Sequence, residues 1–400
     1  MAGMSTKDYL FEDIFYIVML SLVFLSNTIG GIPQNFCFLI ISFEIFLALL
    51  TFSLNRFRMK EEAKRKVLPV FFKYNVVIKI IIHLYTIGLV VLGITEKRFL
   101  SSNIRTYLNA VSAIAIVYLL GEKAWRKSII ALILTWILSV FWVILKYGRD
   151  FVQHVEFHDL AFATGYFFLY YIIFKKQWRY SDLKYVLFAI AIIFVTGKRI
   201  GMAGLLVAVA CHFILTSFSS ERKKQKVITF IGWAMLIGCY LFVFLVINGF
   251  LFRAVSRLVK NTGLFLMGRN YYWDVMAKMC EFKPLFWGYG RNASATLFTN
   301  EYAYMHVGNM HSDILKMYME CGFILFGVWL YNYLRLFVKK VYMHFGFWPM
   351  YVFFIMTIYT FFVYLTDNTE TYPITQYFYM LVPTIYCLQS VQSGLAKAEE

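Results

Sequence analysis

The chain has 400 residues, of which 60% are hydrophobic and 15% are charged, and its formal net charge is +17. Soluble domains of this size carry more charge, so this composition, with a mean hydropathy of +0.65, excludes a water-soluble globular protein. It predicts an all-α polytopic integral membrane protein. The six cysteines have no framework spacing and form no CxxC pair, so they say little about the redox compartment.

Apolar runs follow one another along the chain. A spanning helix needs ~20 mostly apolar residues, and this criterion predicts about twelve transmembrane helices. The runs occupy residues 11–30, 36–54, 74–94, 104–120, 128–145, 160–174, 185–196, 200–218, 228–250, 321–337, 346–366 and 375–393. The predicted division places the first nine runs within 1–250, one large extracytoplasmic loop over 251–320, and the last three runs within 321–400.

Three ionisable residues fall inside these runs: Glu44 in the second, and Lys79 and His83 in the third. Charged groups within a membrane are functional candidates by default. A structural ion pair between neighbouring helices is an equally good interpretation, and the sequence alone does not choose between the two.

Basic residues gather in alternate connections between the runs. The positive-inside rule places all of these connections, and with them both chain termini, in the cytoplasm. The net charge is therefore mainly an orientation signal, with anionic lipid headgroups as incidental partners, and nucleic-acid binding is a poor alternative. The five basic connections are NRFRMKEEAKRK, GEKAWRK, KKQWRYSDLK, ERKKQK and KKVYMHFG.

One outer connection, RDFVQHVEFHDL, raises the question of a metal. His154 and His158 are four residues apart, which on a helix lets two imidazoles share an ion. Glu156 does not stand where an HExxH motif requires it. A solvated polar loop is the simpler interpretation, and no metal or other cofactor is predicted.

The large outer loop is rich in aromatic residues and charges of both signs, so it is expected to be ordered. Within NYYWDVMAKMCEF, Trp273, Met276 and Cys280 recur at helical spacing, while Asp274 and Lys278 fall mostly on another side. This pattern predicts an amphipathic helix on the outer surface.

The end of this loop, HSDIL, carries the best candidate for proton transfer. Ser312 is suited to cap a helix, and Asp313 then lies in its first turn. His311 precedes the helix, whose positive end favours a neutral imidazole that can accept a proton. On spacing alone, a hydrogen-bonded loop histidine is the more common case.

Several guanidinium groups are predicted on the same outer face. Arg199 lies at a tight turn in TGKRIG, and Arg269 and Arg291 lie in MGRNYYW and WGYGRN. The planar fork of arginine binds diphosphate oxygens bidentately. Any one of these arginines is more often a salt-bridged or snorkelling side chain, but several on one face favour an anion site.

An ordered series of these motifs resembles the O-antigen ligase/polymerase family of bacterial lipid-linked polysaccharide enzymes. The series runs from TGKRIGMAGLL through Arg269, Trp273 and PLFWGYGR to HSDIL and Gly322, over residues 196–327. His311, Ser312 and Gly322 fit the family's spacing, whereas Leu325 stands where the family has a second glycine. Arg257 and Gly268 match a further, weaker family pattern.

The resemblance implies a GT-C-like glycosyltransferase in the bacterial cytoplasmic membrane, with a metal-independent active site on the extracytoplasmic face. The donor would be a saccharide on undecaprenyl diphosphate, His311 the catalytic base, and Arg199, Arg269 and Arg291 the diphosphate-binding residues. Lys198, Arg257 and Tyr318 are secondary candidates for substrate contact. An apolar groove between helices would hold the polyprenyl tail. A chain-length regulator and a flippase are the implied protein partners.

Four functions remain open on the sequence. A repeat-unit polymerase is favoured, but a ligase that transfers finished polysaccharide to a lipid or protein needs the same base and the same diphosphate clamp. A flippase for lipid-linked sugars should carry several cations at mid-membrane depth, where Lys79 is nearly alone. A scaffold would not depend on His311.

Overall fold

The computed structural model describes residues 6–28, 34–54, 62–96, 104–149, 157–175, 180–262, 269–300 and 310–399, and these ranges are helical apart from short connections. Three π-helical turns continue α-helices without a break, and two 3₁₀ turns precede helices. The elements are α1 Thr6–Thr28, α2 Gln34–Leu54, α3 Glu62–Phe71, η2 Phe72–Val76, α4 Val77–Val91, α5 Ile104–Leu120, α6 Lys123–Tyr147, α7 His158–Leu169, η5 Tyr170–Phe174, η6 Tyr180–Asp182, α8 Leu183–Val195, α9 Arg199–Thr216, α10 Glu221–Ile247, α11 Phe250–Thr262, α12 Arg269–Met279, α13 Ala293–Asn300, α14 Asp313–Tyr331, η8 Asn332–Phe337, α15 Val338–Phe345, α16 Phe347–Tyr364, η9 Thr369–Thr371 and α17 Pro373–Glu399.

Within the described residues, 6 helices are long and apolar enough to cross a membrane. Shorter apolar helices of 10–17 residues accompany them. The all-α, multi-pass membrane class predicted from composition is therefore supported, while the full number of crossings stays a prediction. The six long helices are Ala63–Val91, Lys123–Tyr147, Arg199–Thr216, Glu221–Ile247, Asp313–Phe345 and Phe347–Tyr364.

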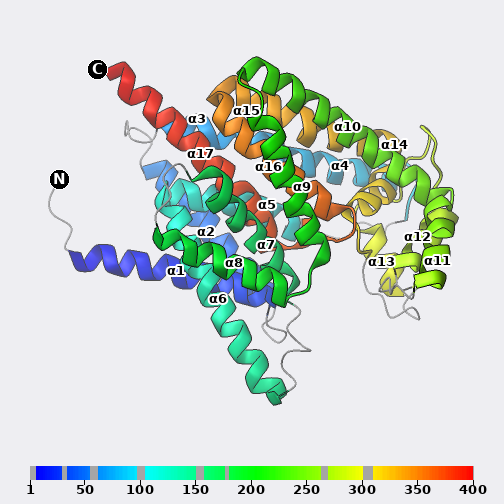
Figure 1. Ribbon diagram of the computed structural model, residues 1–400, viewed down its shortest axis with the longest axis horizontal. Helices are drawn as coiled ribbons and strands as arrows, with labels where there is room; N and C mark the ends of the chain where they lie inside the picture. Colours follow the sequence, from blue (N-terminus) through cyan, green and yellow to red (C-terminus); the bar gives the residue numbers. More distant parts are fainter. Residues whose placement is uncertain are drawn as a thin grey trace.

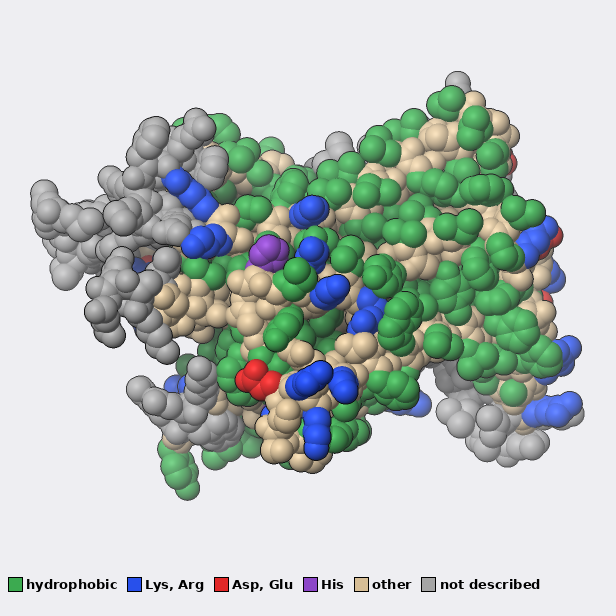
Figure 2. Space-filling view, turned by 90° about the horizontal axis from the view of Figure 1, so that it is seen from above, with side chains coloured by type: hydrophobic (Ala, Val, Ile, Leu, Met, Phe, Trp, Pro, Cys, Tyr) green, Lys and Arg blue, Asp and Glu red, His purple; other side chains and the backbone are tan. Residues whose placement is uncertain are grey.

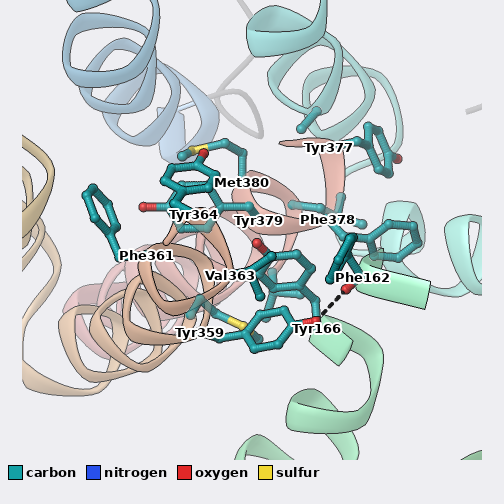
Figure 3. Packing of buried hydrophobic residues seen from close by; sticks show 14 of the residues in the cluster. Phe162, Tyr166, Tyr359, Phe361, Val363, Tyr364, Tyr377, Phe378, Tyr379 and Met380 are labelled. Carbon is teal, nitrogen blue, oxygen red and sulfur yellow. Dashed lines mark hydrogen bonds between the residues drawn. The ribbon is translucent and has the colours of Figure 1, made fainter. Parts of the chain in front are cut away.

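The helix α16 lies at the centre of the core, between α9 and α17. Figure 3 shows the aromatic side chains packed around it. Tyr359 donates from its hydroxyl to the carbonyl of Phe162 at 3.1 Å. Two small residues make room for its ring, because a Cβ at Gly165 would lie 2.1 Å from the Tyr359 hydroxyl and one at Gly204 would lie 3.2 Å from Cδ2. Glycine here permits the close helix approach typical of membrane bundles.

The bundle has two distinct ends. Figure 1 shows the first turn of α1 and the last turn of α17 on the left, and α11, α12 and α13 on the right. Ser390 of α17 donates to the carbonyl of Phe345 at 2.9 Å, and Tyr386 donates to that of Phe174 at 2.5 Å. The second half of α17 therefore contacts the last residues of η5 and α15. The segment between α10 and α14 lies at the other end.

Candidate active site

Ser312 caps α14, as the sequence predicts. Its hydroxyl accepts from the backbone N–H of Leu315 at 3.2 Å and donates to the carbonyl of Tyr364 at 3.2 Å. The cap therefore fixes the start of α14 against the end of α16. His311 comes directly before it, with a side chain 41% exposed and a ring 5.8 Å from that of Tyr272 in α12.

A carboxylate faces this histidine. His311 Nδ1 lies 3.9 Å from Oδ1 of Asp367, in the connection between α16 and α17. The backbone N–H of Asn368 donates to the same oxygen at 2.9 Å, and the Tyr372 hydroxyl does so at 3.3 Å. Asp313 donates its backbone N–H to the carbonyl of Asp367 at 3.0 Å. The carboxylate is thus held beside the ring, and the half-exposed imidazole keeps a second nitrogen for proton transfer.

Beneath this pair lies a buried cluster of charges from four segments of the chain. Arg291 donates to Glu370 at 2.9 Å and to Glu320 at 3.3 Å. Lys79 in α4 donates to the other oxygen of Glu370 at 3.0 Å, and Lys316 Nζ lies 4.0 Å from Glu370. All five side chains are buried. Buried charges persist only when they are paired and hydrogen-bonded, which this arrangement achieves.

The cluster keeps its central members ionised. Burial raises the pKa of Glu370, but the Arg291, Lys79 and Lys316 cations outweigh burial and hold that pKa below its usual range. Burial lowers the pKa of Arg291, and the Glu370 and Glu320 carboxylates more than reverse this, so it ends above its usual value. Glu370 also donates its backbone N–H to Asp313 Oδ2 at 2.7 Å. The charge cluster is thereby tied to the first turn of α14, two residues from His311.

The sequence predicts Arg291 as part of an open diphosphate-binding site. In the structure its guanidinium is instead buried and paired with the carboxylates of Glu320 and Glu370. Lys79 fits the alternative of a structural ion pair, but its partner is Glu370 and not Glu44. Glu44 is buried and accepts from Ser112 at 3.1 Å.

The loop that carries Arg291 docks on a break in α14. At Gly322 the helix backbone turns to φ 70° and ψ −178°, which leaves carbonyls of the preceding turn without helical partners. Tyr289 and Gly290 donate their N–H groups to the carbonyls of Met319 and Glu320, each at 2.9 Å. In the opposite direction, the backbone N–H of Phe323 donates to the carbonyl of Phe286 at 2.8 Å. The break thus becomes a backbone docking site for the loop.

Two glycines make this contact possible. A Cβ at Gly288 would lie 2.4 Å from the backbone nitrogen of Gly322, and one at Gly322 would lie 2.3 Å from the Phe286 carbonyl oxygen. Tyr318 supports the same loop: it is buried, and its hydroxyl donates to the carbonyl of Glu281 at 2.7 Å. Tyr318 was predicted to contact substrate, but in this structure it has a packing role and does not present its hydroxyl to an open site.

Arg199 opens α9 and is exposed. Two residues later, a Cβ at Gly201 would lie 3.4 Å from the ring of Phe162, which stacks on Tyr372 at 6.4 Å between centroids. Tyr372 in turn donates to Asp367. The start of α9 therefore belongs to the same end of the bundle as His311. Within the part of the chain that the structure describes, Arg199 forms no ion pair.

The remaining cationic candidates lie around this end. Lys198 is the half-buried cap residue of α9, and Arg257 is exposed on α11. Arg269 begins α12, one turn before the Tyr272 that contacts His311, but its side chain lies outside the described part of the chain. Gly268, its predecessor, is not described either. Side-chain contacts thus link the start of α12 to His311 through Tyr272, and the start of α9 to His311 through Phe162, Tyr372 and Asp367.

The predicted amphipathic helix is present as α12, but its buried face is shifted from the predicted one, because Trp273 is only partly buried. Tyr272, Val275 and Met276 are buried in the protein core, while Asp274 and Lys278 pair at 2.6 Å on the exposed side. Its apolar face therefore packs on the protein itself.

No group of three or more His, Cys, Asp or Glu residues suited to a metal occurs among the described residues. Of the candidate pair in the outer connection, His154 lies outside these residues. His158 begins α7, and its side chain is not described.

Sequence reasoning missed Asp367, Glu370, Glu320 and Lys316. A signal for two of them existed: TDNTETYP is an acidic connection between the last two apolar runs, on the side predicted to be external. Lys79, inside a run, required an anionic partner, and this connection was able to supply it.

Comparison with known families adds an independent observation. Residues 185–330 match the O-antigen ligase family. The match spans α8 through α14, and so includes Arg199, the docked loop, His311 and Gly322. It supports the O-antigen ligase/polymerase family, whose members are glycosyltransferase-like enzymes, and it does not separate a polymerase from a ligase. No curated protein matches the chain.

Proposed function

We propose that this protein polymerises undecaprenyl-diphosphate-linked oligosaccharide repeat units on the outer face of the bacterial cytoplasmic membrane. The observation that carries the proposal is the half-exposed His311 beside the fixed Asp367 carboxylate, within the end of a membrane bundle that also presents an exposed Arg199. The O-antigen ligase match over residues 185–330, which include Arg199 and His311, supports this class of chemistry.

The reaction needs a base for a sugar hydroxyl. In the proposed step, the hydroxyl oxygen of the incoming unit bonds to the anomeric carbon of the donor, and the bond from that carbon to the diphosphate oxygen breaks. The leaving diphosphate takes the electron pair, and His311 takes the hydroxyl proton. Asp367 faces the other ring nitrogen and stabilises the imidazolium that results. A base in this role is worth about 10²–10⁴-fold in rate.

The leaving group gains charge as it departs, so a fixed cation stabilises the transition state. Arg199 is exposed and suits this task, with Arg269 as a second contributor from α12. Arg291 takes a different part in the proposal: it fixes the loop and the 366–371 turn that hold the site together.

A groove on the bundle suits the polyprenyl tail. It has a volume of about 300 Å³ between α9, α10 and α16, and apolar side chains dominate its lining. Val207 in this lining is eight residues after Arg199, which is about 12 Å along the helix. Leu365, at the other side, comes two residues before Asp367. The lining comprises Val207, Cys211, Ile231, Met235, Gly238, Cys239, Phe242, Ile358, Phe361, Phe362 and Leu365.

The decisive experiment incubates purified protein with lipid-linked repeat units and resolves the products by length. The proposal expects a ladder of longer lipid-linked chains, and His311→Ala should lose at least about 10²-fold in rate while remaining inserted and monodisperse. A ladder of unchanged rate in His311→Ala would reject the base assignment.

The same assay separates the second candidate, a ligase. Adding a lipid or peptide acceptor that carries no diphosphate should leave the ladder unchanged for a polymerase. Transfer of chains only to that acceptor would identify a ligase, which needs the same base and the same diphosphate contacts. The docked loop and His311 do not favour one over the other, so the acceptor comparison decides.

A further inference from the structure

A second pocket lies between α10 and the η8–α15 segment, apart from the site at His311. Its volume is about 270 Å³. Gly232 allows α10 to approach, because a Cβ there would lie 2.7 Å from the carbonyl oxygen of Leu334. The π-helical turn η8 presents Arg335 into this space, and such turns are frequent at functional sites. The lining is Gln225, Ile228, Thr229, Arg335, Val338, Lys339, Tyr342 and Met350.

The pocket is cationic and carries no counter-charge of its own. Arg335 Nη1 donates to the carbonyl of Thr229 at 3.2 Å, and its guanidinium lies 5.3 Å from the ring centroid of Trp233. Its Nε is buried and has no hydrogen-bond partner among the described residues. Lys339 is one turn further on and exposed, and within the described chain neither cation pairs with a carboxylate. Two cations without a carboxylate partner, one of which has an unsatisfied Nε donor, point to an anionic ligand.

The depth of the pocket in the membrane indicates which kind of anion it binds. After the break at Gly322, residues 323–345 continue as one helical segment of about 35 Å, against a hydrocarbon core of ~30 Å. Arg335 and Lys339 fall within about 15 Å of its end at Phe345, near headgroup depth. Trp233 and Tyr342 are partly exposed beside them, as aromatic residues are at membrane interfaces. Figure 2, which views the α10 and α15 side, shows Lys and Arg gathered on a largely hydrophobic face.

We propose that this pocket binds the phosphate headgroup of an anionic phospholipid from the surrounding leaflet. The phosphate oxygens accept from the Arg335 guanidinium and from Lys339, with Gln225 and Tyr342 as further polar contacts. Ile228, Val338 and Met350 supply the apolar side that a glycerolipid needs and a free phosphate does not. The pocket lies along η8 and α15, which includes most of the basic segment 339–346, at the end of the bundle opposite His311, so this lipid is distinct from the glycosyl donor.

The test measures lipid adducts and thermal stability of the purified full-length protein in a neutral detergent. The probes are phosphatidylglycerol, phosphatidylcholine with the same acyl chains, and inorganic phosphate. The proposal expects retention and a raised Tm with phosphatidylglycerol only. Lys339→Gln should weaken that binding about five-fold. Lys340→Gln is the matched control, since Lys340 is the next residue and does not line the pocket.

Three results would overturn the proposal. Equal retention of both lipids would show that the pocket does not distinguish headgroups by their charge. An equal effect of Lys339→Gln and Lys340→Gln would show that binding is not local to the pocket. Stabilisation by inorganic phosphate alone, lost in Lys339→Gln, would assign the pocket to a soluble anion. Arg335→Lys, which keeps the charge but loses the planar guanidinium, should bind more weakly than the unmodified protein and provides a second check.

Discussion

At the scale of single residues, burial separates arginines that look alike in sequence. Arg199 is exposed and forms no ion pair within the described ranges, whereas Arg291 is buried between Glu320 and Glu370. A buried cation with two carboxylates serves the fold, because removing it leaves uncompensated charge in a dry interior. An exposed guanidinium at a helix start keeps its donors for a ligand.

Substituting these two arginines should therefore affect different properties: stability for Arg291 and donor binding for Arg199. Arg291→Ala is expected to destabilise the protein by about 3–5 kcal/mol, because Glu320 and Glu370 remain buried without their cation. Arg199→Ala should leave the melting temperature within error and raise the donor KM by about 10- to 100-fold. Thermal unfolding in detergent and steady-state kinetics measure the two effects. If Arg291→Ala melted like the unmodified protein, the structural role assigned to the cluster would be wrong.

At the scale of elements, the central feature is the break in α14 at Gly322, where one residue leaves the helical conformation. The break at Gly322 exposes the carbonyls of Met319 and Glu320, and the loop supplies the N–H groups of Tyr289 and Gly290. Tyr240 of α10 donates to the carbonyl of Phe323 at 2.7 Å, which satisfies a further group near the break. Backbone bonds therefore help to fix the loop, and the glycines at 288 and 322 allow this close contact.

Gly322→Ala and Gly88→Ala form a matched pair that tests this contact. Only glycine adopts the Gly322 backbone angles readily, so alanine should cost about 1–3 kcal/mol from strain alone, with the clash at Phe286 in addition. Gly88 lies in α4, and a Cβ added there would have no neighbouring heavy atom within 4 Å, so alanine should be neutral or stabilising by up to about 1 kcal/mol. Limited proteolysis of the 281–291 segment reports the docking. Equal protection in both variants would contradict the account.

At the scale of the whole molecule, the ends of η5 and α15 next to two basic segments lie opposite the proposed active site. Contacts from α17 reach the carbonyls of Phe345 and Phe174, beside two of the basic connections. His311, Asp367 and the loop lie at the other end, where Asp313 bonds to the turn after α16. If the positive-inside rule orients the bundle, the proposed active site faces away from the cytoplasm.

Cysteine labelling in cells checks this orientation. Tyr180 is 96% exposed in a basic connection, and the Glu281 side chain is 61% exposed in the docked loop. A membrane-impermeant maleimide should label Glu281→Cys in intact spheroplasts and Tyr180→Cys only after permeabilisation. The unmodified chain gives the background, since its five described cysteines are at least half-buried. Labelling in the reverse order would place His311 in the cytoplasm and end the proposed function.

Features that depend on local chemistry could be predicted without any knowledge of the fold. Apolar length predicted the helical membrane class, and the cap formed by Ser312 and the amphipathic α12 follow from spacing within one segment. The glycine at 322 was recognised through a family resemblance, although its spacing gave no physical reason for it. None of these features requires knowing which helix lies beside which.

Which polar groups meet could be learned only from the packing of the helices. Glu370 pairs with Lys79 across 291 positions of chain, and Asp367 reaches His311 from the connection between α16 and α17. The same packing buries Arg291 and Tyr318, which the sequence placed at an open site, and leaves Arg199 exposed. The physical reason is that a charge inside a membrane bundle must find an opposite charge, and helix packing, not sequence distance, determines which one lies within reach.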